Sequence, residues 1–406
     1  MLEQARALDA SDPLRNCRDR FDLPEGVVYL DGNSLGALPK ATKARLADVV
    51  QREWGEDLIR SWNCTERGGD WIGMPQRIGA KIAPLIGAAR HEVIACDSVS
   101  VNLAKLIGGA LAMHPDRNVV LSEPGNFPTD LYMVQGDARA EQRLADRDAI
   151  VDALDSSVAL LMLTHVHYKT GAMFDMAALT AAAHEAGALV LWDLSHSGGA
   201  VPVDLTAADA DFAVGCGYKY LNGGPGAPAY AYVAERHHAA FRNPLPGWMG
   251  HAAPFAFEDE YEPAPGVSRL LAGTPPVLAM AALECGVELV AEIGMAPLVK
   301  KSRALSEFTR AAMAEHCPAL PCVSPADPTQ RGSQLSFRHP DAYALCQALI
   351  ARGIIGDFRA PDLLRMGFAP AYVSFGDCAK AVQALAEVLD SGEWQRAEFQ
   401  ERAAVT

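Results

Sequence analysis

The sequence predicts an α/β fold with a mostly parallel central sheet, followed by a smaller α+β unit. Between Val93 and Val233, a short apolar run, a loop rich in Gly, Asp or Ser, and an alanine-rich stretch recur in that order. This alternation is typical of a parallel sheet, because a helix must carry the chain back before the next parallel strand begins. Beyond residue 277, strand-like and helical stretches alternate again over a shorter length.

The length of the chain, 406 residues, exceeds the usual size of one domain. We expect residues 1–88 to form an N-terminal arm and part of a small domain, residues 89–276 a large domain, and residues 277–406 a linking helix and the C-terminal small domain. Within the arm, VVYLDGNSLGALP at Val27–Pro39 is rich in turn residues and predicts an extended segment.

Apolar runs of three to seven residues predict the strands of the large domain. They are Glu92–Ala95, Val119–Leu121, Val158–Thr164, Ala188–Asp193, Phe212–Cys216 and Ala229–Val233. Helical stretches between them include Asn102–Met113 and Met176–Glu185. Gly187 suits the C-terminal end of the second helix, because glycine accepts the left-handed conformation found there.

The C-terminal part begins after Pro244–Pro276, a stretch rich in Pro, Gly and aromatic residues that predicts irregular structure. A helix at about Val277–Val290 is expected to lead into the small domain. There the sequence predicts two strands and two helices, near Ser333–Phe337, Leu364–Phe368, Ala342–Arg352 and Ala379–Leu389 respectively.

Composition and charge exclude several classes of function. The net charge of −15, without a block of Lys and Arg, argues against nucleic acid as a partner. No run approaches the ~20 apolar residues of a membrane helix, and the first residues lack an export signal, so we expect a cytoplasmic protein. The nine cysteines lack C-x-x-C spacing, and His165 and His167 lack a third ligand nearby. We therefore predict reduced thiols and no metal site.

Lys219 lies in the segment DFAVGCGYKYLNGGPG at Asp211–Gly226. In this segment an apolar strand is predicted to end and a glycine-rich loop follows. Ligands of α/β sheets collect beyond the carboxyl ends of the strands, where Lys219 is expected to lie. An ordinary lysine is neutral to only roughly one part in 2,500 at pH 7, so a catalytic amine needs burial, a nearby cation or a Schiff base. Pyridoxal phosphate (PLP) supplies a Schiff base, while a surface lysine in a polar loop is the alternative.

Asp193 ends the apolar run Ala188–Trp192 at the same predicted edge of the sheet as Lys219. A carboxylate there can pair with the pyridine nitrogen of PLP and keep the ring able to accept electrons from the substrate α-carbon. The alternative is an Asp that caps the following loop. His196, three residues later, can lie beside the ring or be structural.

Two loops can hold a phosphate or stack on a ring. CDSVSVN at Cys96–Asn102 passes from a strand into a helix, so backbone N–H groups and Ser100 can meet an anion at the helix N-terminus. Ser as an ordinary N-cap explains the same pattern. GNFPTD at Gly125–Asp130 offers Phe127 for stacking and Asp130 as a polar contact, or Pro128 simply begins a helix.

The order of these features resembles the class V group of fold-type I PLP enzymes, the aspartate aminotransferase superfamily, and within it the kynureninase family. The resemblance covers nearly the whole chain. The segments that carry it are LDGNSLG at Leu30–Gly36, GNFPTD at Gly125–Asp130, WDLSHSGGA at Trp192–Ala200, GCGYKYLNGGPGAPA at Gly215–Ala229, GWMGH at Gly247–His251 and GTPP at Gly273–Pro276.

The resemblance implies a role for each site residue. Lys219 would carry PLP as a Schiff base, Asp193 would pair with the pyridine nitrogen, Tyr218 would shuttle protons, and Arg365 would bind the substrate α-carboxylate. The further residues that it implies at the cofactor are Val99, Ser100, Phe127, Asp130, Thr164, His196, Tyr218, Trp248 and Thr274. Trp248 and Thr274 would come from the second subunit of a homodimer with its active site at the interface. Family members often carry Asn where Thr274 stands, which makes that contact less secure.

The implied reaction is the hydrolysis of L-kynurenine, or its 3-hydroxy derivative, to anthranilate, or 3-hydroxyanthranilate, and L-alanine, by cleavage of the Cβ–Cγ bond. Desulfurases of the same group place a nucleophilic cysteine shortly before the carboxylate-binding arginine, and Gly353–Leu364 contains none. The alternative that the protein is an aminotransferase with another substrate stays open. The presence of Lys219, Asp193 and Arg365 together argues against a PLP-binding protein without activity.

Overall fold

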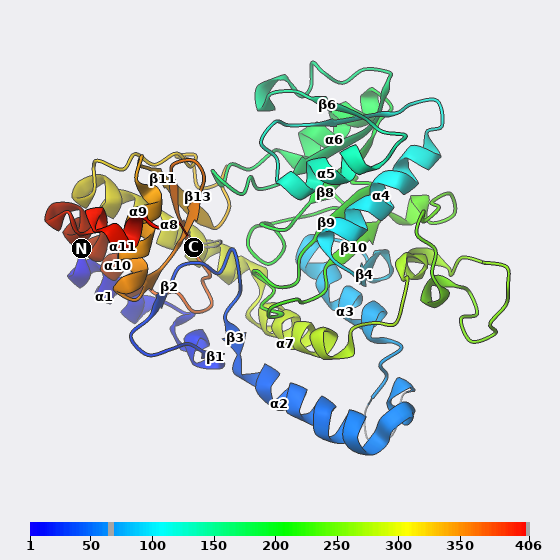
Figure 1. Ribbon diagram of the computed structural model, residues 1–406, viewed down its shortest axis with the longest axis horizontal. Helices are drawn as coiled ribbons and strands as arrows, with labels where there is room; N and C mark the ends of the chain where they lie inside the picture. The colour runs from blue at the N-terminus through cyan, green and yellow to red at the C-terminus, as the bar shows by residue number, and fades with distance from the viewer. Residues whose placement is uncertain (64–68, 403–406) are drawn as a thin grey trace.

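The structure, a computed structural model, describes residues 1–63 and 69–402. Figure 1 shows two units: a large one built on a central sheet, and a smaller one that contains both chain termini. Helix α7 (Val277–Ile293) lies between them, and α2 (Lys40–Asp48) extends along the lower edge of the view, away from the small unit. The chain therefore crosses between the units more than once.

The large unit contains a seven-stranded sheet in the order β4-β10-β9-β8-β7-β5-β6. Its strands are β4 (Val93–Ala95), β5 (Val119–Ser122), β6 (Glu141–Leu144), β7 (Val158–Thr164), β8 (Leu189–Asp193), β9 (Phe212–Gly215) and β10 (Tyr230–Val233). β10 runs antiparallel to both of its neighbours, β4 and β9, and the other strand pairs of the described sheet are parallel. The predicted α/β class with a mostly parallel sheet is confirmed.

Burial on both faces explains why the strands of this sheet are apolar at nearly every position. Along β7 and β8, successive side chains enter two separate apolar cores: Leu163 and Trp192 lie in one, Met162 and Leu191 in the other. Helix α4 (Val99–Met113) packs in the second core, whereas α3 (Met74–Ile82) and α6 (Met176–Glu185) pack in the first. The sheet is thus held rigidly between helices, and its carboxyl edge is a stable platform for a site.

The structure differs from the predicted elements in three places: one strand and one helix were not predicted, and another helix begins earlier than expected. The edge strand β6 has partly exposed polar residues, EQRL, and therefore lacks an apolar run. Helix α8 (Met295–His316) was not predicted either. Helix α4 begins at Val99, three residues earlier than expected, because the Ser98 side chain accepts a hydrogen bond from Val101 N and caps it.

The small unit combines α8 with a three-stranded antiparallel sheet in the order β11-β14-β13. A parallel pair between β2 and β12 joins the N-terminal arm to this unit, and α1 packs on α10. The domain boundaries at residues 88 and 276 stay a prediction. The remaining elements are α1 (Leu2–Ser11), β1 (Phe21–Asp22), β2 (Val28–Tyr29), β3 (Leu38–Pro39), α5 (Pro128–Gly136), β11 (Gln334–Arg338), α9 (Ala342–Ala351), β12 (Ile354–Ile355), β13 (Asp357–Arg359), β14 (Leu363–Gly367), α10 (Phe375–Ser391) and α11 (Ala397–Gln400).

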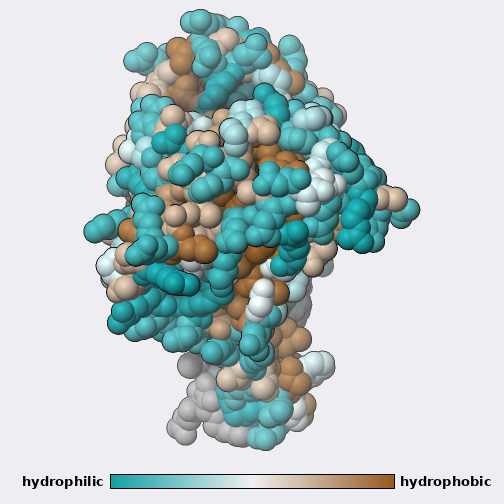
Figure 2. Space-filling view, turned by 90° about the vertical axis from the view of Figure 1, so that its left-hand side faces the viewer, coloured by the Kyte–Doolittle hydropathy of each residue, from teal (hydrophilic) through white to brown (hydrophobic). Residues whose placement is uncertain are grey.

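The surface on the side of the small unit is mostly hydrophilic, with apolar residues in scattered patches (Figure 2). Across the described ranges, no helix combines the length and the apolar character that crossing a bilayer requires. Eight of the cysteines are free thiols, and Cys64 lies outside the described residues.

Asp211 is buried at the amino end of β9 and holds the start of this strand to its neighbours. We expect Asp211→Asn to lower the free energy of unfolding by about 2 kcal/mol at neutral pH. Burial alone would raise the pKa of Asp211, but hydrogen bonds from His237, His184, Val190 N and Arg236 outweigh burial and lower it from 3.8 to about 2. Because the pKa is lowered by folding, this contribution is present above about pH 4 and is lost as the pH falls toward 2. Urea unfolding at several pH values measures it.

The matched control is Asp152→Asn, which removes a charge from an exposed carboxylate. We expect this control to unfold at the same urea concentration as the unchanged protein. An Asp211→Asn variant as stable as the control at neutral pH would show that this cluster contributes no net stability.

Candidate active site

The candidate site lies where three neighbouring parallel strands end. Thr164 ends β7 and pairs in register with Asp193, which ends β8, and Asp193 pairs with Val214 near the end of β9. Lys219 follows β9 by four residues. These side chains border a cavity of about 160 Å³ at the carboxyl edge of the sheet. The position agrees with the general location of ligand sites in α/β sheets.

Most of the residues singled out from the sequence line this cavity. They are Val99, Ser100, Phe127, Thr164, Asp193, His196, Tyr218 and Lys219. The sequence analysis did not single out the other lining residues, which are Ser98, Thr129, Tyr168, Ser195, Cys216, Ala227 and Ala229. Segments far apart in the chain therefore meet at this cavity, while the roles that the resemblance implies for their residues stay predictions.

Lys219 is buried, and its Nζ lies 2.9 Å from His196 Nε2. Nδ1 of His196 lies 3.1 Å from Gln334 Oε1, and Gln334 Nε2 donates to the Tyr168 carbonyl at 2.9 Å. Burial and the nearby Lys219 charge lower the pKa of His196 well below its ordinary value. A neutral His196 whose Nδ1–H donates to Gln334 presents Nε2 as an acceptor for Lys219 Nζ. The amine is therefore held in one position by a defined chain of hydrogen bonds.

Asp193 is buried, and its Oδ1 accepts hydrogen bonds from Ser195 N at 2.8 Å and Ser195 Oγ at 2.6 Å. Burial raises the pKa of Asp193, while Ser195 and the Lys219 charge act in the opposite direction. A buried carboxylate in this position is stabilised by a cationic partner in the cavity. A protonated ring nitrogen is such a partner.

Asp130 lies behind the cavity wall rather than in it. Its Oδ2 accepts a hydrogen bond from Thr164 Oγ1 at 3.0 Å, and its Oδ1 has no hydrogen-bond partner among the described residues. Burial and the neighbouring Asp193 charge raise its pKa. Asp130 therefore reaches the site through Thr164.

The start of α4 borders the cavity with backbone and hydroxyl donors. Ser98, Val99 and Ser100 line the cavity, and Ser100 Oγ lies 3.0 Å from Thr129 Oγ1 at the start of α5. Ser98 is the N-cap of α4, which confirms the N-cap interpretation of this motif, while phosphate binding there stays a prediction. Helix N-termini with adjacent hydroxyl groups bind phosphate, because their N–H groups lack partners within the helix.

The donor set fits PLP. A buried amine, a buried carboxylate and a helix N-terminus with hydroxyl groups surround one cavity, as required for an aldehyde, a pyridine nitrogen and a phosphate. Phe127 adds an aromatic surface, since its ring centroid lies 5.9 Å from Lys219 Nζ. Its ring also contacts Tyr168 edge-on, with the centroids 5.2 Å apart.

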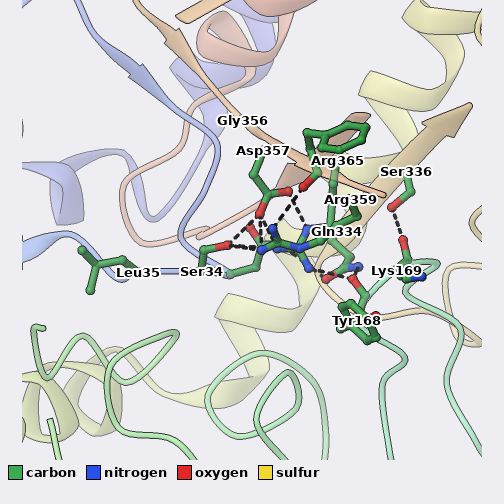
Figure 3. Close-up of polar contacts among 12 residues, drawn as sticks. Ser34, Leu35, Tyr168, Lys169, Gln334, Ser336, Gly356, Asp357, Arg359 and Arg365 are labelled. Carbon is green, nitrogen blue, oxygen red and sulfur yellow. Dashed lines mark hydrogen bonds and ion pairs between the residues drawn. The ribbon is translucent and has the colours of Figure 1, made fainter. Parts of the chain in front are cut away.

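Arg365 on β14 is fully buried but does not line the cavity itself. Figure 3 shows its guanidinium between the small unit and the N-terminal arm. Nε donates to Asp357 Oδ1 at 2.8 Å, Nη2 donates to Asp357 Oδ2 and to Ser34 Oγ, and Nη1 donates to the Tyr168 carbonyl at 2.6 Å. Because Tyr168 O also accepts from Gln334, Arg365 is connected to the Lys219 hydrogen-bond chain.

Trp248 and Thr274 are exposed and do not line the cavity of this chain. Trp248 begins a short 3-10 helix, Trp248–Gly250, and contacts Phe255 with the ring centroids 5.6 Å apart. Their expected role, contact with the cofactor of a second subunit, stays a prediction.

Sequence reasoning missed the polar residues that support Lys219 and Arg365. Gln334 and Asp357 lie on β11 and β13, far from any motif, and no local signal marks them. Ser34 lies in the LDGNSLG segment that carried the resemblance, so a signal existed, but its contact with the two arginines depends on the tertiary structure.

Known proteins share both the sequence and the fold of this chain. The family model described as the kynureninase C-terminal domain matches residues 298–385. Kynureninases from Burkholderia mallei and Burkholderia pseudomallei are 51% identical over 416 residues, covering 100% of this chain and 99% of those proteins. A kynureninase from Pseudomonas fluorescens is 48% identical over 412 residues, covering 98% of each chain.

Solved structures of cysteine desulfurases share the fold at low identity. An apo structure from Thermococcus onnurineus NA1 has a TM-score of 0.78 at 18% identity and covers 93% of this chain and 98% of its own. The desulfurase CsdA from Escherichia coli has a TM-score of 0.75 at 21% identity and covers 94% and 98%. These likenesses confirm the fold class, that of fold-type I PLP enzymes. Because relatives that are 51% identical align with all of this chain, the chain belongs to the kynureninase family.

Proposed function

We propose that this protein hydrolyses L-kynurenine, and also its 3-hydroxy derivative, to anthranilate or 3-hydroxyanthranilate and L-alanine, with PLP bound at Lys219. The reaction adds one water and breaks the Cβ–Cγ bond of the substrate. The observation that carries the proposal is the meeting of Lys219, Asp193 and a phosphate-binding helix start at one cavity of a kynureninase-family chain. The proposal places the protein in tryptophan metabolism through kynurenine.

PLP, when bound, supplies an electron-accepting ring conjugated to the substrate amine. Asp193 would keep the ring nitrogen protonated, and Ser195 holds the Asp193 carboxylate in place through two hydrogen bonds. The hydroxyl and N–H groups at the start of α4 would hold the phosphate. Phe127 would offer its aromatic ring to the cofactor.

Lys219 Nζ moves the protons at the substrate α-carbon. The amine already lies in a chain of hydrogen bonds with His196 and Gln334, which fixes its position when it is not bonded to the cofactor. Tyr218 borders the cavity beside Lys219 and serves as a second proton carrier. Burial raises the pKa of Tyr218, so the phenol keeps its proton near neutral pH and can donate it.

Arg365 binds the substrate α-carboxylate. Asp357 already accepts from Nε and Nη2. Two parallel N–H donors, which a lysine cannot offer, are therefore presented at the Nη1–Nη2 edge when the substrate carboxylate replaces Ser34 and the Tyr168 carbonyl as acceptors there. Before the substrate arrives, the contact of Arg365 with the Tyr168 carbonyl, and through Gln334 with His196, aligns carboxylate binding with the position of Lys219. The substrate therefore spans the two units of the molecule.

A homodimer completes the site in this proposal. Trp248 and Thr274 are exposed in the single chain, and Trp248 lies beside exposed Phe255 on an irregular segment. Large exposed aromatic side chains of this kind are enriched at protein interfaces. The proposed location is the cytoplasm, as expected from the sequence.

Incubation of the PLP-loaded protein with L-kynurenine tests the function. Anthranilate is measured by its fluorescence, and alanine is quantified in a separate assay. We expect the two products in equal amounts. The Lys219→Ala variant serves as the control for background. Formation of alanine from cysteine, with sulfide released when a thiol reductant is added, and no anthranilate from kynurenine would instead assign the desulfurase reaction and contradict the proposal.

A further inference from the structure

The residues around Arg365 form what we call the arginine cluster: Asp31, Ser34, Asp357, Arg359 and Arg365 (Figure 3 labels all but Asp31). Ser34 Oγ donates to Asp357 Oδ2 at 2.7 Å and accepts from both arginines, at 2.9 Å from Arg365 and 3.1 Å from Arg359. Arg359 Nη2 also contacts Asp357 Oδ2 at 2.7 Å. Two cations therefore share one fully buried carboxylate.

Asp31 belongs to the same cluster from the N-terminal arm. It forms a bridge with Gly367 at the end of β14, and Ser34 N and Leu35 N donate to its carbonyl at 2.9 and 3.1 Å. This turn places its side chain within hydrogen-bonding reach of Asp357. A hydrogen bond between two carboxyl groups requires that one of them carries a proton.

The shared proton belongs to Asp31. Burial and the Asp357 charge raise the pKa of Asp31 to about 7. Burial acts in the same direction on Asp357, but Arg365 outweighs it and lowers the pKa of Asp357. Asp357 is therefore ionised across the neutral range, and Asp31 changes its charge within that range.

The net charge of the arginine cluster then depends on whether Asp31 is protonated. With Asp31 neutral, two arginines and one aspartate leave a surplus of one positive charge, which matches one carboxylate. With Asp31 ionised, the charges cancel before the substrate arrives. Because Asp357 and Arg365 are fully buried, an unmatched charge beside them is costly.

Other titratable groups around Asp31 keep one charge state over the neutral range. Besides Asp357, Arg359 and Arg365, the groups that face it are Tyr29, Tyr220, Tyr372 and Cys346. Burial raises the pKa of each of these phenols and of the thiol, so they remain neutral. His196, which faces Arg365, also remains neutral because burial lowers its pKa.

We propose that Asp31 couples binding of the substrate α-carboxylate at the arginine cluster to the uptake of one proton. The proposal rests on the proposed function, because it takes Arg365 as the group that binds the carboxylate. Asp31 acts through Asp357 and the arginines and is a positioning residue rather than a catalytic one. Affinity for the carboxylate is highest with Asp31 protonated and falls as the pH rises through the neutral range.

The probe is 4-oxo-4-phenylbutanoate, which has the aryl ketone and carboxylate of the substrate but no amine to react with the cofactor. Titration calorimetry on the PLP-loaded protein, in buffers of different ionisation enthalpy, gives both the Kd and the number of protons taken up. From about pH 6.5 to about pH 8.5 we expect the Kd to rise at least about tenfold, with about one proton taken up per ligand at the higher pH. The corresponding amide should show neither effect.

Asp31→Asn keeps a neutral side chain of the same shape at every pH. We expect it to reduce the change in Kd over this pH range to less than about twofold and to remove the proton uptake. Asp152→Asn, at an exposed carboxylate, should keep the dependence of the unchanged protein. Absence of proton uptake by the unchanged protein, or the same pH dependence in Asp31→Asn, would overturn the proposal. Either result with intact kynurenine hydrolysis rejects only this inference, whereas absence of hydrolysis rejects the proposed function.

Discussion

The Lys219→Ala variant is expected to lose kynurenine hydrolysis by about 10³-fold or more, because one change removes both the covalent anchor of the cofactor and the group that moves the α-proton. The truncation also leaves His196 without its partner at 2.9 Å. Borohydride reduction followed by mass measurement of the protein tests the anchor directly. The unchanged protein should gain the mass of the reduced cofactor, and the variant should not.

The matched control is Lys169→Ala. Lys169 lies near the site, with its Nζ 5.7 Å from the Tyr168 ring centroid, but it does not line the cavity. We expect borohydride to fix the cofactor to this variant as it does to the unchanged protein. If the cofactor is still fixed to Lys219→Ala but no longer to Lys169→Ala, then Lys169 and not Lys219 carries the Schiff base, which contradicts the proposal.

The second large effect is expected for Asp193→Asn, which should lower kcat by about 10²- to 10³-fold. The asparagine Oδ1 can still accept both hydrogen bonds from Ser195, so the local structure is retained while the negative charge is lost. Without that charge the ring nitrogen loses its proton, and the cofactor becomes a weaker electron acceptor. Stopped-flow absorbance separates proton removal at the α-carbon from later steps.

Asp175→Asn is the control for the loss of a charge. Asp175 caps α6 by accepting a hydrogen bond from Ala178 N at 3.0 Å, and asparagine caps a helix equally well. This variant should keep full activity and the visible absorbance of the bound cofactor. An Asp193→Asn enzyme with unchanged kcat and full cofactor content would exclude the proposed pairing with the ring nitrogen.

Helices and strands were predictable where burial forces an apolar pattern. The runs that became β7 and β8 were found within one residue, because both faces of those strands are covered by helices. β6 was not found because an edge strand with exposed polar residues has no such pattern. Its existence follows from pairing with β5, which is a tertiary contact.

The residues of the candidate site likewise fall into those that the sequence predicted and those that only the structure brought together. Asp193 ends a buried strand and Lys219 follows another, so the sequence indicated that they share one edge of the sheet. Thr164, which ends β7, was found through the resemblance. Arg365 was found through resemblance, and its contacts with Asp357, Ser34 and the Tyr168 carbonyl were not. Each of those partners lies on a different segment, and no local spacing links them.

By itself, the sequence determined the class of fold, the edge of the sheet that holds the lysine and the family, because apolar periodicity and motif order are local properties of a chain. Only the tertiary structure decided the charge state and the orientation of the polar groups. The position of half-buried Asp31 next to Asp357, and the hydrogen bonds from Lys219 through His196 to Gln334, depend on distances between remote segments. Electrostatic free energies follow those distances and the exclusion of water, neither of which a linear pattern contains.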